Sequence, residues 1–258
     1  KAIINIDDLV GREIINEGNL KSHQFISYAI DRDADLKVKN IVYKNNKTIF
    51  DFLWEKNPYQ IKTNIFGKHN IYNLLSVIAS LLNYKFPMGM IIEAIENLES
   101  IAGRNEVVHH NDNGTPQIII DYAHTPDALE NILQSLGETE PSEIILIFGC
   151  GGNRDKGKRK QMAFIASKYA DKVIVTSDNP RDENPYDILN TIEKNLSVNN
   201  EVIASREDAI KRGLMLVKKK GILLIAGKGH ENFQEIKGVK IPFSDKQVAL
   251  SNIGLINN

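Results

Sequence analysis

Residues 144–159 read IILIFGCGGNRDKGKR. An unbroken apolar run, Ile144–Phe148, is followed here by a loop rich in glycine and positive charge. An amphipathic helix, a second apolar run at Val173–Thr176 and the loop DNPR at 178–181 come next. This succession of strand, loop, helix, strand and loop predicts one crossover unit of a parallel sheet. Ligands of such sheets bind at the carboxyl ends of the strands, so we look for function in these two loops.

The same alternation extends over the second half of the chain. Helix starts are chemically marked, because Thr125-Pro126 places proline after a capping residue and Ser244 with Gln247 forms a capping box. From residue 103 onward we predict an α/β domain with a doubly wound, mostly parallel, Rossmann-like sheet. The predicted strands are Ile118–Ile120, Ile144–Phe148, Val173–Thr176, Glu201–Ala204 and Ile222–Ala226. The predicted helices lie near Pro126–Leu136, Gly157–Ala170, Pro185–Leu196 and Glu207–Lys218.

The first part of the chain has a different character. Short runs of strand-like composition, separated by Asn, Asp and Lys clusters, predict a mostly antiparallel sheet over residues 1–66. These runs are Ala2–Ile6, Phe25–Ile30, Leu36–Tyr43, Thr48–Leu53 and Gln60–Phe66. Apolar residues then recur at helical spacing, which predicts one helix around Ile71 to Leu82 and a second at about Met88–Leu98.

We place a domain boundary near Ala102, where the alternating pattern begins. The chain of 258 residues is long enough for two ordinary domains, which we expect at 1–102 and 103–258. Its first residues read as a strand already under way and lack an initiator methionine. We therefore expect the chain to be a piece of a longer protein.

The bulk composition excludes several classes of protein. The formal net charge of -1 provides no global field that recruits nucleic acid or an anionic membrane. No window approaches 18 uncharged apolar residues, and the first residues lack a signal-peptide pattern. A single cysteine, Cys150, excludes an internal disulfide and a cysteine-cluster metal site. We expect a cytoplasmic, monomeric enzyme without a nucleic-acid or membrane partner.

The glycine-rich loop has the spacing of a phosphate-binding loop but departs from it at one position. Residue 159 is arginine where a Ser or Thr must ligate magnesium. We interpret the loop as an anion site made of backbone N–H groups, a helix amino end and Arg154, which is a planar donor for carboxylate or phosphate. A solvated basic turn is the alternative.

Two further loops carry complementary charges. Asp178, Asn179 and Arg181 supply a carboxylate, an amide and a guanidinium, and Pro180 holds their loop extended. Such a set can bind a zwitterion, because arginine takes a carboxylate and aspartate takes an ammonium. The strand at Ile222–Ala226 ends in GKGHE, where Gly227 allows close backbone approach and Glu231 can hold an amine. A plain surface turn is the alternative for the first of these loops.

Four other polar residues lie at element ends. Asp121 follows a strand directly, a usual place to grip a ribose hydroxyl or a magnesium-bound phosphate, and His124 follows it. Asn70 and Asn73 are three residues apart in a first helical turn and therefore face the same way. Ordinary capping for Asp121 and the asparagines, and a hydrogen-bonded structural role for His124, remain open.

Together these motifs resemble the Mur ligase family of ATP-dependent peptide ligases. The resemblance covers essentially the whole chain. Residues 5–8 (NIDD) and 67–73 (GKHNIYN) match the latter half of the family's central ATPase domain. Gly103-Arg104 and the segments 121–126 (DYAHTP), 149–159, 178–181 and 226–231 match its carboxyl-terminal domain.

The resemblance implies a reaction and roles for residues. ATP would phosphorylate the D-glutamate carboxylate of UDP-N-acetylmuramoyl-L-Ala-D-Glu, and an incoming amine would attack the acyl phosphate to form a C–N bond. The ATP-binding residues would be Asn70, Asn73, Arg104, Asp121 and His124. The amino acid would be bound by Arg154, Asp178, Asn179, Pro180, Arg181, Gly227 and Glu231.

The resemblance also implies a substrate and a limit. In the family a DNPR loop goes with meso-diaminopimelate, whose distal carboxylate lysine lacks, and a site built for a buried charge rejects an analogue without it. The family's phosphate loop, its magnesium ligands, its carbamylated lysine and its uridine-nucleotide domain precede residue 1. We therefore expect ATP and Mg²⁺ to serve the full-length enzyme, with no metal site and no activity in this chain. The alternatives are a lysine-adding homologue, a folylpolyglutamate or cyanophycin-type ligase, and a noncatalytic amino-acid-binding module.

Overall fold

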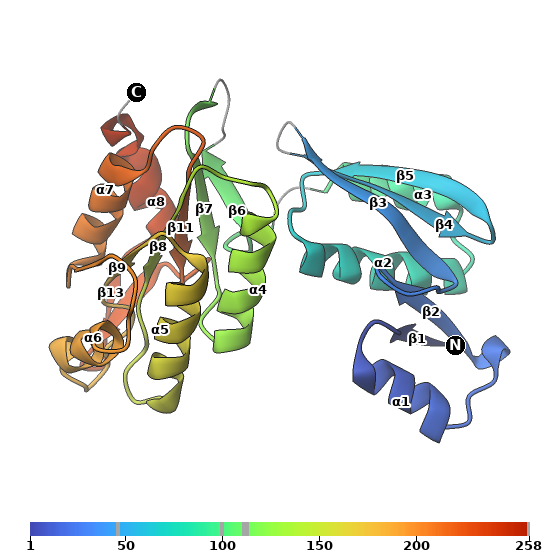
Figure 1. Ribbon diagram of the computed structural model, residues 1–258, viewed down its shortest axis with the longest axis horizontal. Coiled ribbons are helices and arrows are strands. Elements are labelled where there is room, and N and C mark those ends of the chain that lie inside the picture. Colours follow the sequence, from blue (N-terminus) through green and yellow to red (C-terminus); the bar gives the residue numbers. More distant parts are fainter. Residues whose placement is uncertain (45–46, 99–100, 110–113, 257–258) are drawn as a thin grey trace. The chain divides into compact units, whose positions relative to one another are not determined.

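The computed structural model describes residues 1–44, 47–98, 101–109 and 114–256. The chain divides into two compact units, Lys1–Glu99 and Ser100–Asn258, whose elements are labelled in Figure 1. The boundary predicted at Ala102 lies just inside the second unit. None of the helices in these described ranges is both long and apolar enough to cross a membrane.

The first unit contains a mixed five-stranded sheet with strand order β1-β2-β3-β4-β5. Its strands are β1 (Ala2–Asn5), β2 (Phe25–Ala29), β3 (Leu36–Lys44), β4 (Lys47–Trp54) and β5 (Asn57–Thr63). The expectation of a mostly antiparallel sheet is wrong for the first three strands, because β1, β2 and β3 pair in parallel. A helix that we did not predict, α1 (Leu9–Glu17), connects β1 to β2. It begins at Asp8, whose side chain accepts a hydrogen bond from the Val10 N–H at 2.8 Å.

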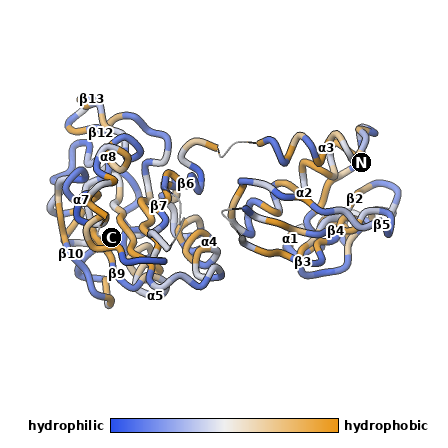
Figure 2. The backbone as a smooth tube through the Cα atoms, turned by 90° about the horizontal axis from the view of Figure 1, so that it is seen from above, coloured by the Kyte–Doolittle hydropathy of each residue, from blue (hydrophilic) through white to orange (hydrophobic). Residues whose placement is uncertain are grey.

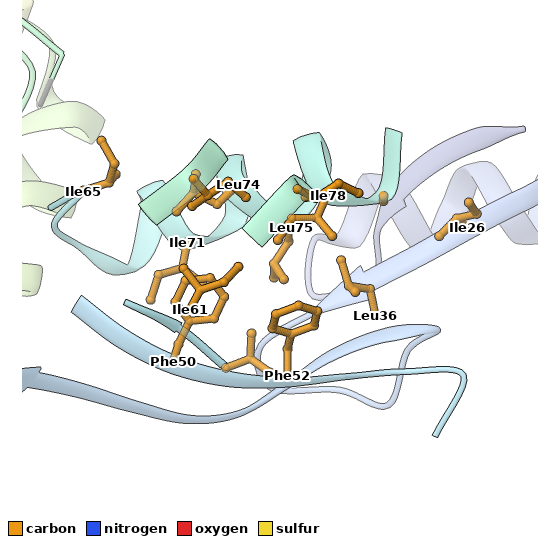
Figure 3. Packing of buried hydrophobic residues seen from close by; sticks show 14 residues of the cluster. Ile26, Leu36, Phe50, Phe52, Ile61, Ile65, Ile71, Leu74, Leu75 and Ile78 are labelled. Carbon is orange, nitrogen blue, oxygen red and sulfur yellow. The ribbon is translucent and has the colours of Figure 1, made fainter. Parts of the chain in front are cut away.

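Two helices pack on this sheet and bury the core of the unit. The helices are α2 (Lys68–Asn83) and α3 (Met88–Glu96), close to the predicted segments. Figure 3 shows Leu75 and Ile78 of α2 facing Phe50 and Phe52 of β4. All four side chains are fully buried, and burial of each such side chain contributes about 1.5–3 kcal/mol.

The second unit contains a six-stranded sheet with strand order β10-β9-β8-β11-β7-β6. All its strand pairs are parallel except β6 with β7. The strands are β6 (Glu106–His109), β7 (Gln117–Asp121), β8 (Ile144–Phe148), β9 (Lys172–Val175), β10 (Asn200–Val202) and β11 (Ile222–Ala226). The five parallel strands lie where the sequence predicts them, to within two residues at each end.

The strand order of this sheet determines which of its two faces each helix covers. From β7 to β10 the chain moves one way along the sheet through α4 (Pro126–Gly137), α5 (Gly157–Tyr169) and α6 (Pro185–Glu193). It then reverses through α7 (Arg206–Leu216) to reach β11, so right-handed crossovers place α7 on the opposite face. Residues of α7 and of α8 (Asp245–Ser251) accordingly share one core cluster with Ile145, Ile147 and Leu223. In Figure 2 the hydrophilic colours gather in the loops around the outside of this unit.

The predicted N-caps at Thr125 and Ser244 are confirmed, and one hairpin was not predicted. The Thr125 hydroxyl accepts from the Ala128 N–H, and the Ser244 hydroxyl accepts from the Gln247 N–H, both at 3.3 Å. The hairpin joins β12 (Phe233–Ile236) to β13 (Val239–Pro242). It follows the GKGHE loop and lies beside the DNPR loop, because Arg181 forms a β-bridge with Ile236. The hairpin thus becomes part of the site described below.

Leu75→Ala tests the core of the first unit. We expect the free energy of unfolding to fall by about 2–5 kcal/mol, because the truncation leaves a cavity between α2 and the sheet. Val77→Ala on the same helix is the matched control, since Val77 is 47% exposed, and its effect should stay within about 0.5 kcal/mol. Urea titration followed by circular dichroism measures both, and equal effects would contradict the described packing.

Candidate functional site

Loops that follow β7, β8, β9 and β11 surround a cavity of about 320 Å³. These loops meet because the carboxyl ends of parallel strands lie at the same edge of the sheet. The structure brings six of the seven predicted amino-acid-site residues to its wall: Arg154, Asp178, Asn179, Arg181, Gly227 and Glu231. Pro180 does not line the cavity, but its carbonyl packs against the neighbouring loop.

Backbone packing fixes the loops after β8 and β9 against each other. The Gly152 N–H donates to the Asn179 carbonyl at 2.9 Å. A Cβ atom at Gly152 would lie 1.9 Å from the Pro180 carbonyl oxygen, which is far inside van der Waals contact. Residue 152 must therefore be glycine for the two loops to approach this closely.

A carboxylate that we did not predict clamps the basic loop. Glu183 accepts two hydrogen bonds from the Arg159 guanidinium, at 2.9 and 3.0 Å, and one from the Asn153 N–H at 2.6 Å. The hydrogen bonds from Arg159 lower the pKa of Glu183 despite an opposing effect of burial. Arg159, where a phosphate-binding loop has Ser or Thr, is therefore a buried structural residue. No motif marked Glu183, because its role depends on a partner 24 residues away.

Arg154 differs from Arg159, because it has no hydrogen-bond or ion-pair partner among the described residues. Its side chain is exposed and lines the cavity. Lys158 lines the same side and donates to the His124 carbonyl at 3.1 Å. The interpretation of this loop as a plain basic turn does not account for a cavity that both cations face. Asp155 of the same loop also lines the cavity, so the two cations and this carboxylate leave a net positive charge on this side.

Arg181 is held in place by the β12 hairpin. Its backbone N–H donates to the Glu235 carbonyl at 3.1 Å, and its own carbonyl accepts from the Lys237 N–H at 2.8 Å. The guanidinium donates to the Gly152 carbonyl at 2.9 Å and lies 3.2 Å from the Glu235 carboxylate. These contacts hold Arg181 at a positive φ of 51°, which is uncommon for a residue with a side chain. The hairpin thus sets the direction in which Arg181 points.

The loops after β9 and β11 are joined by a buried lysine that the sequence analysis left out of the site. Lys228 donates to the Asn179 Oδ1 and to the Glu231 Oε2 atoms, both at 3.0 Å. Asn179 also donates to the Glu231 Oε2 atom, at 2.9 Å. Burial raises the pKa of Glu231, but the hydrogen bonds from Asn179 and Lys228 outweigh it and lower this pKa. The sequence feature that could have identified Lys228 is its position between two glycines at the end of a fully buried strand.

Glycine at 227 lets the same two loops approach each other. Its φ of 115° lies in the region that residues with side chains rarely adopt. A Cβ atom there would lie 2.7 Å from the Asp178 Oδ2 atom. Asp178 and Glu231 therefore lie together on a negatively charged side of the cavity, while Arg154 lies in the loop after β8 and Lys158 in the first turn of α5. A ligand that carries both an ammonium and a carboxylate matches this arrangement.

Asp121 is a buried residue that organises its own turn. Its two carboxylate oxygens accept from the Asn105 N–H and the Ala123 N–H, each at 2.6 Å. Burial raises the pKa of Asp121, and these hydrogen bonds and Arg104 offset part of the increase. Asp121 is not part of the cavity wall, so its assignment to a nucleotide remains a prediction.

Arg104 and His124 lie around one aromatic ring. The Arg104 guanidinium lies 4.8 Å from the centre of the Tyr122 ring. The ring centres of His124 and His230 lie 4.6 and 5.4 Å from the same centre. His124 also forms a 2.8 Å hydrogen bond between its Nδ1 atom and the Tyr122 carbonyl. The nucleotide contact predicted for Arg104 and His124 therefore remains a prediction, and His124 also lines the cavity.

Asn70 and Asn73 belong to the first unit and are described within it. Asn70 donates to the Phe66 carbonyl at 2.7 Å, and Asn73 donates to the Asn70 Oδ1 atom at 3.3 Å. Gly67 precedes α2 and provides no side-chain cap, so neither asparagine occupies the N-cap position. Their predicted role toward the nucleotide base therefore remains a prediction.

Hydrogen bonds link the first turn of α8 to two of the loops. Asp245 accepts two hydrogen bonds from the buried Arg206, both at 2.8 Å, and Arg206 donates to the carbonyl of Ala226, the last residue of β11, at 3.0 Å. Lys246 donates to Glu106 at 2.6 Å, and Glu106 accepts from the Gly103 N–H at 2.7 Å. One short helix therefore anchors the loop that carries Gly227 and the loop that carries Arg104.

Cys150 has no role as a nucleophile. Its thiol is buried and 3.7 Å from the Met162 sulfur, and burial raises its pKa to about 12. A thiol in this state is protonated at neutral pH and is chemically inert.

Two family models match the chain. The Mur ligase middle domain matches residues 1–81, and the Mur ligase glutamate ligase domain matches residues 103–229. A UDP-N-acetylmuramoyl-L-alanyl-D-glutamate–2,6-diaminopimelate ligase of Clostridium acetobutylicum is 40% identical over 250 residues, 96% of this chain and 51% of the relative. The ligase of the same name from Aquifex aeolicus is 40% identical over 98% of this chain and 51% of its own length. The chain thus spans about half the length of the curated relatives that it matches.

Solved structures agree with these matches. A diaminopimelate ligase of the same name has a TM-score of 0.69 at 31% identity, covering 98% of this chain and 53% of its own. The folylpolyglutamate synthase of Thermotoga maritima has a TM-score of 0.59 at 23% identity, covering 84% of this chain and 48% of its own. This second likeness shows the fold alone.

Gly152→Ala tests the contact between the two loops. We expect a loss of about 1–3 kcal/mol in unfolding free energy, because the added methyl group meets the Pro180 carbonyl. Gly137→Ala is the control, since no atom lies within 4 Å of a Cβ atom there, and it should be neutral or slightly stabilising. Thermal and urea unfolding of the three proteins measure the difference. Equal stability of both variants would contradict the close approach.

Glu183→Gln tests the carboxylate clamp through pH. Because the pKa of Glu183 is lowered in the folded state, its contribution to stability is present above the unfolded value near 4.5 and is lost as the pH falls through the folded value. The stability difference between the parent and Glu183→Gln should therefore be larger at pH 7 than at pH 3. Urea unfolding at both pH values measures it, with the exposed Glu193→Gln as a control that shows no such trend. A pH-independent difference would contradict the assignment.

Proposed function

The chain belongs to the Mur ligase family, and we propose that it forms the amino-acid-binding part of an ATP-dependent peptide ligase. The observation that carries this proposal is the cavity at the carboxyl edge of the second sheet. Its wall carries the cations of Arg154, Lys158 and Arg181 and the carboxylates of Asp178 and Glu231, with Asp155 beside Arg154. Hydrogen bonds to Asn179 and to the Gly152 carbonyl hold Glu231 and Arg181. The proposal places the enzyme in the cytoplasm, where ATP is available.

We propose the reaction that membership of the Mur ligase family implies, with the two substrates that the names of the relatives give. ATP transfers its terminal phosphoryl group to the D-glutamate carboxylate of UDP-N-acetylmuramoyl-L-Ala-D-Glu. The amine of the incoming amino acid then attacks the acyl carbon, loses a proton, and displaces inorganic phosphate to leave an amide. The present chain contributes to this scheme by orienting the incoming amine, which converts a collision into a positioned attack.

The described residues do not provide a binding site that fits magnesium. Among them, no group of three or more His, Cys, Asp or Glu side chains could hold a metal ion. Asp121, the one carboxylate that we predicted near the phosphates, has both oxygens bound to backbone N–H groups. We therefore assign no step through magnesium to the described residues.

We propose meso-diaminopimelate as the incoming amino acid. Its distal ammonium matches the Asp178 and Glu231 side of the cavity, and its distal carboxylate matches Arg154 and Arg181. L-lysine has the same amine but would leave the Arg154 guanidinium without a partner, a loss that such sites penalise strongly. The names of the relatives at 40% identity support the same choice.

Arg154→Ala tests the specificity, because Arg154 has no structural partner among the described residues. Loss of a hydrogen bond between charged groups costs about 1.5–3 kcal/mol, so we expect meso-diaminopimelate to bind roughly 10- to 150-fold more weakly. Calorimetric titration of the parent, of Arg154→Ala and of the exposed control Lys160→Ala measures this. L-lysine should bind the parent weakly and should be insensitive to Arg154→Ala.

Two outcomes would contradict the proposal. Equal binding of L-lysine and meso-diaminopimelate by the parent would show that the lysine-adding alternative is at least as good. No binding of either amino acid by the parent would remove the amino-acid site that the proposal assigns to this chain.

A further inference from the structure

Lys228 lies behind the negatively charged side of the cavity and not on its wall. Its side chain is completely buried, and its ammonium group is 3.0 Å from the Glu231 Oε2 atom and 4.0 Å from the Asp178 Oδ1 atom. Both carboxylates line the cavity, whereas Lys228 does not. Asn179 accepts the third contact of the ammonium group, at 3.0 Å. The three side chains near the Lys228 ammonium group, those of Glu231, Asp178 and Asn179, thus all line the cavity.

The charges around this group can be counted. Two further cations lie near the carboxylates, and each already has its own partner. Arg206 forms two 2.8 Å hydrogen bonds with Asp245, and Arg181 lies 3.2 Å from Glu235, so each pair is neutral. What remains is two negative charges and the single positive charge of Lys228. The net charge that faces the cavity here is therefore −1.

Two neighbouring, partly buried carboxylates such as Asp178 and Glu231 repel each other when both are ionised and no cation lies between them. Like charges in one poorly solvated site raise one pKa, and the pair then shares a proton. A buried ammonium group in turn needs charged or polar partners to offset its own loss of hydration. Lys228 satisfies both requirements at once, since it lies between the two carboxylates and has no contact with solvent.

We propose that Lys228 is a positioning residue that fixes the charge of this amine subsite at −1, with both carboxylates ionised, so that the subsite accepts one ammonium group. The inference rests on the proposed function, because it takes the ligand to be an amino acid with a distal ammonium. In this view Lys228 never touches the ligand. It acts through Glu231, Asp178 and Asn179, and it removes the need for a proton to bind or leave when the ligand binds.

Lys228→Met tests the proposal, with Lys240→Met as the matched control. Lys240 is exposed on the hairpin and also lies over the Phe233 ring, at 4.4 Å compared with 5.8 Å for Lys228. Calorimetric titration with meso-diaminopimelate is carried out from pH 5 to pH 8 on both variants and the parent. The ratio of variant to parent affinity is compared, which cancels any pH effect that the variant and the parent share.

For Lys228→Met we expect this ratio to rise with pH. One carboxyl group of the variant retains its proton at low pH, and affinity increases by up to about tenfold per pH unit over the range in which that proton is lost. For Lys240→Met the ratio should stay constant near one. A ratio for Lys228→Met that is lowered equally at all pH values would show a merely structural lysine and would overturn the proposal.

A second comparison, between Glu231→Gln and a double variant, distinguishes a role of Lys228 in the charge of the subsite from a role in supporting the fold. Glu231→Gln alone leaves Asp178 and Lys228, so the subsite becomes neutral. Adding Lys228→Met restores the charge of −1, and the double variant should therefore bind meso-diaminopimelate more tightly than Glu231→Gln alone. If Lys228 only supports the fold, the double variant should bind meso-diaminopimelate more weakly than Glu231→Gln alone. That result would refute the charge argument.

The unaltered chain provides a test that depends on no variant. Carbon-13 NMR titration of the side-chain carboxyl groups should show both Glu231 and Asp178 ionised at pH 6 without ligand. A carboxyl group that keeps its proton above pH 6 would overturn the inference even if every variant fails to fold. Failure of the parent to bind meso-diaminopimelate would count against the proposed function, while the NMR titration would still decide the charge of the subsite.

Discussion

The candidate site depends on one steric constraint, which is the close approach of three loops at the carboxyl edge of the second sheet, made possible by two glycines. Gly152 lies against the Pro180 carbonyl, and Gly227 lies against the Asp178 carboxylate. A methyl group at either position would separate the loops and the charged side chains that they carry. The absence of a side chain at Gly152 and Gly227 therefore determines whether the loops can form the cavity. The side chains around the cavity then determine its chemistry.

Electrostatics determines what these packed loops can hold. Each charge that is fixed by the fold has a partner within the second unit: Arg159 with Glu183, Arg181 with Glu235, Arg206 with Asp245, and Lys228 with Glu231. On the positive side Arg154 and Lys158 line the cavity without an ion-pair partner among the described residues, and together with Asp155 beside them they leave one net positive charge. On the negative side the second carboxylate near Lys228 is the exception. The site thus offers one unbalanced charge of each sign at separate places, which is the pattern that a zwitterion complements.

Much of the second unit could be predicted from the sequence, because its buried strands and capped helices leave strong local signals. The loops at its edge could be predicted too, since glycine, proline and paired charges are concentrated there. Residues that act through distant partners left no such signal. Glu183, Glu235 and Asp245 look like ordinary surface acids until the fold brings Arg159, Arg181 and Arg206 to them. In the first unit α1 was missed, and with it the crossover that makes β1 and β2 parallel.

All the contacts that build the cavity come from residues after Ser100, and the α8 turn that braces them is near the carboxyl terminus of the same unit. Under the proposed function, the choice of amino acid is encoded in one contiguous segment of the gene. A recombination event near residue 100 would then exchange that choice as a single cassette and leave the preceding unit unaltered. Substrate preference could in this way change without a change in the sequence of the first unit.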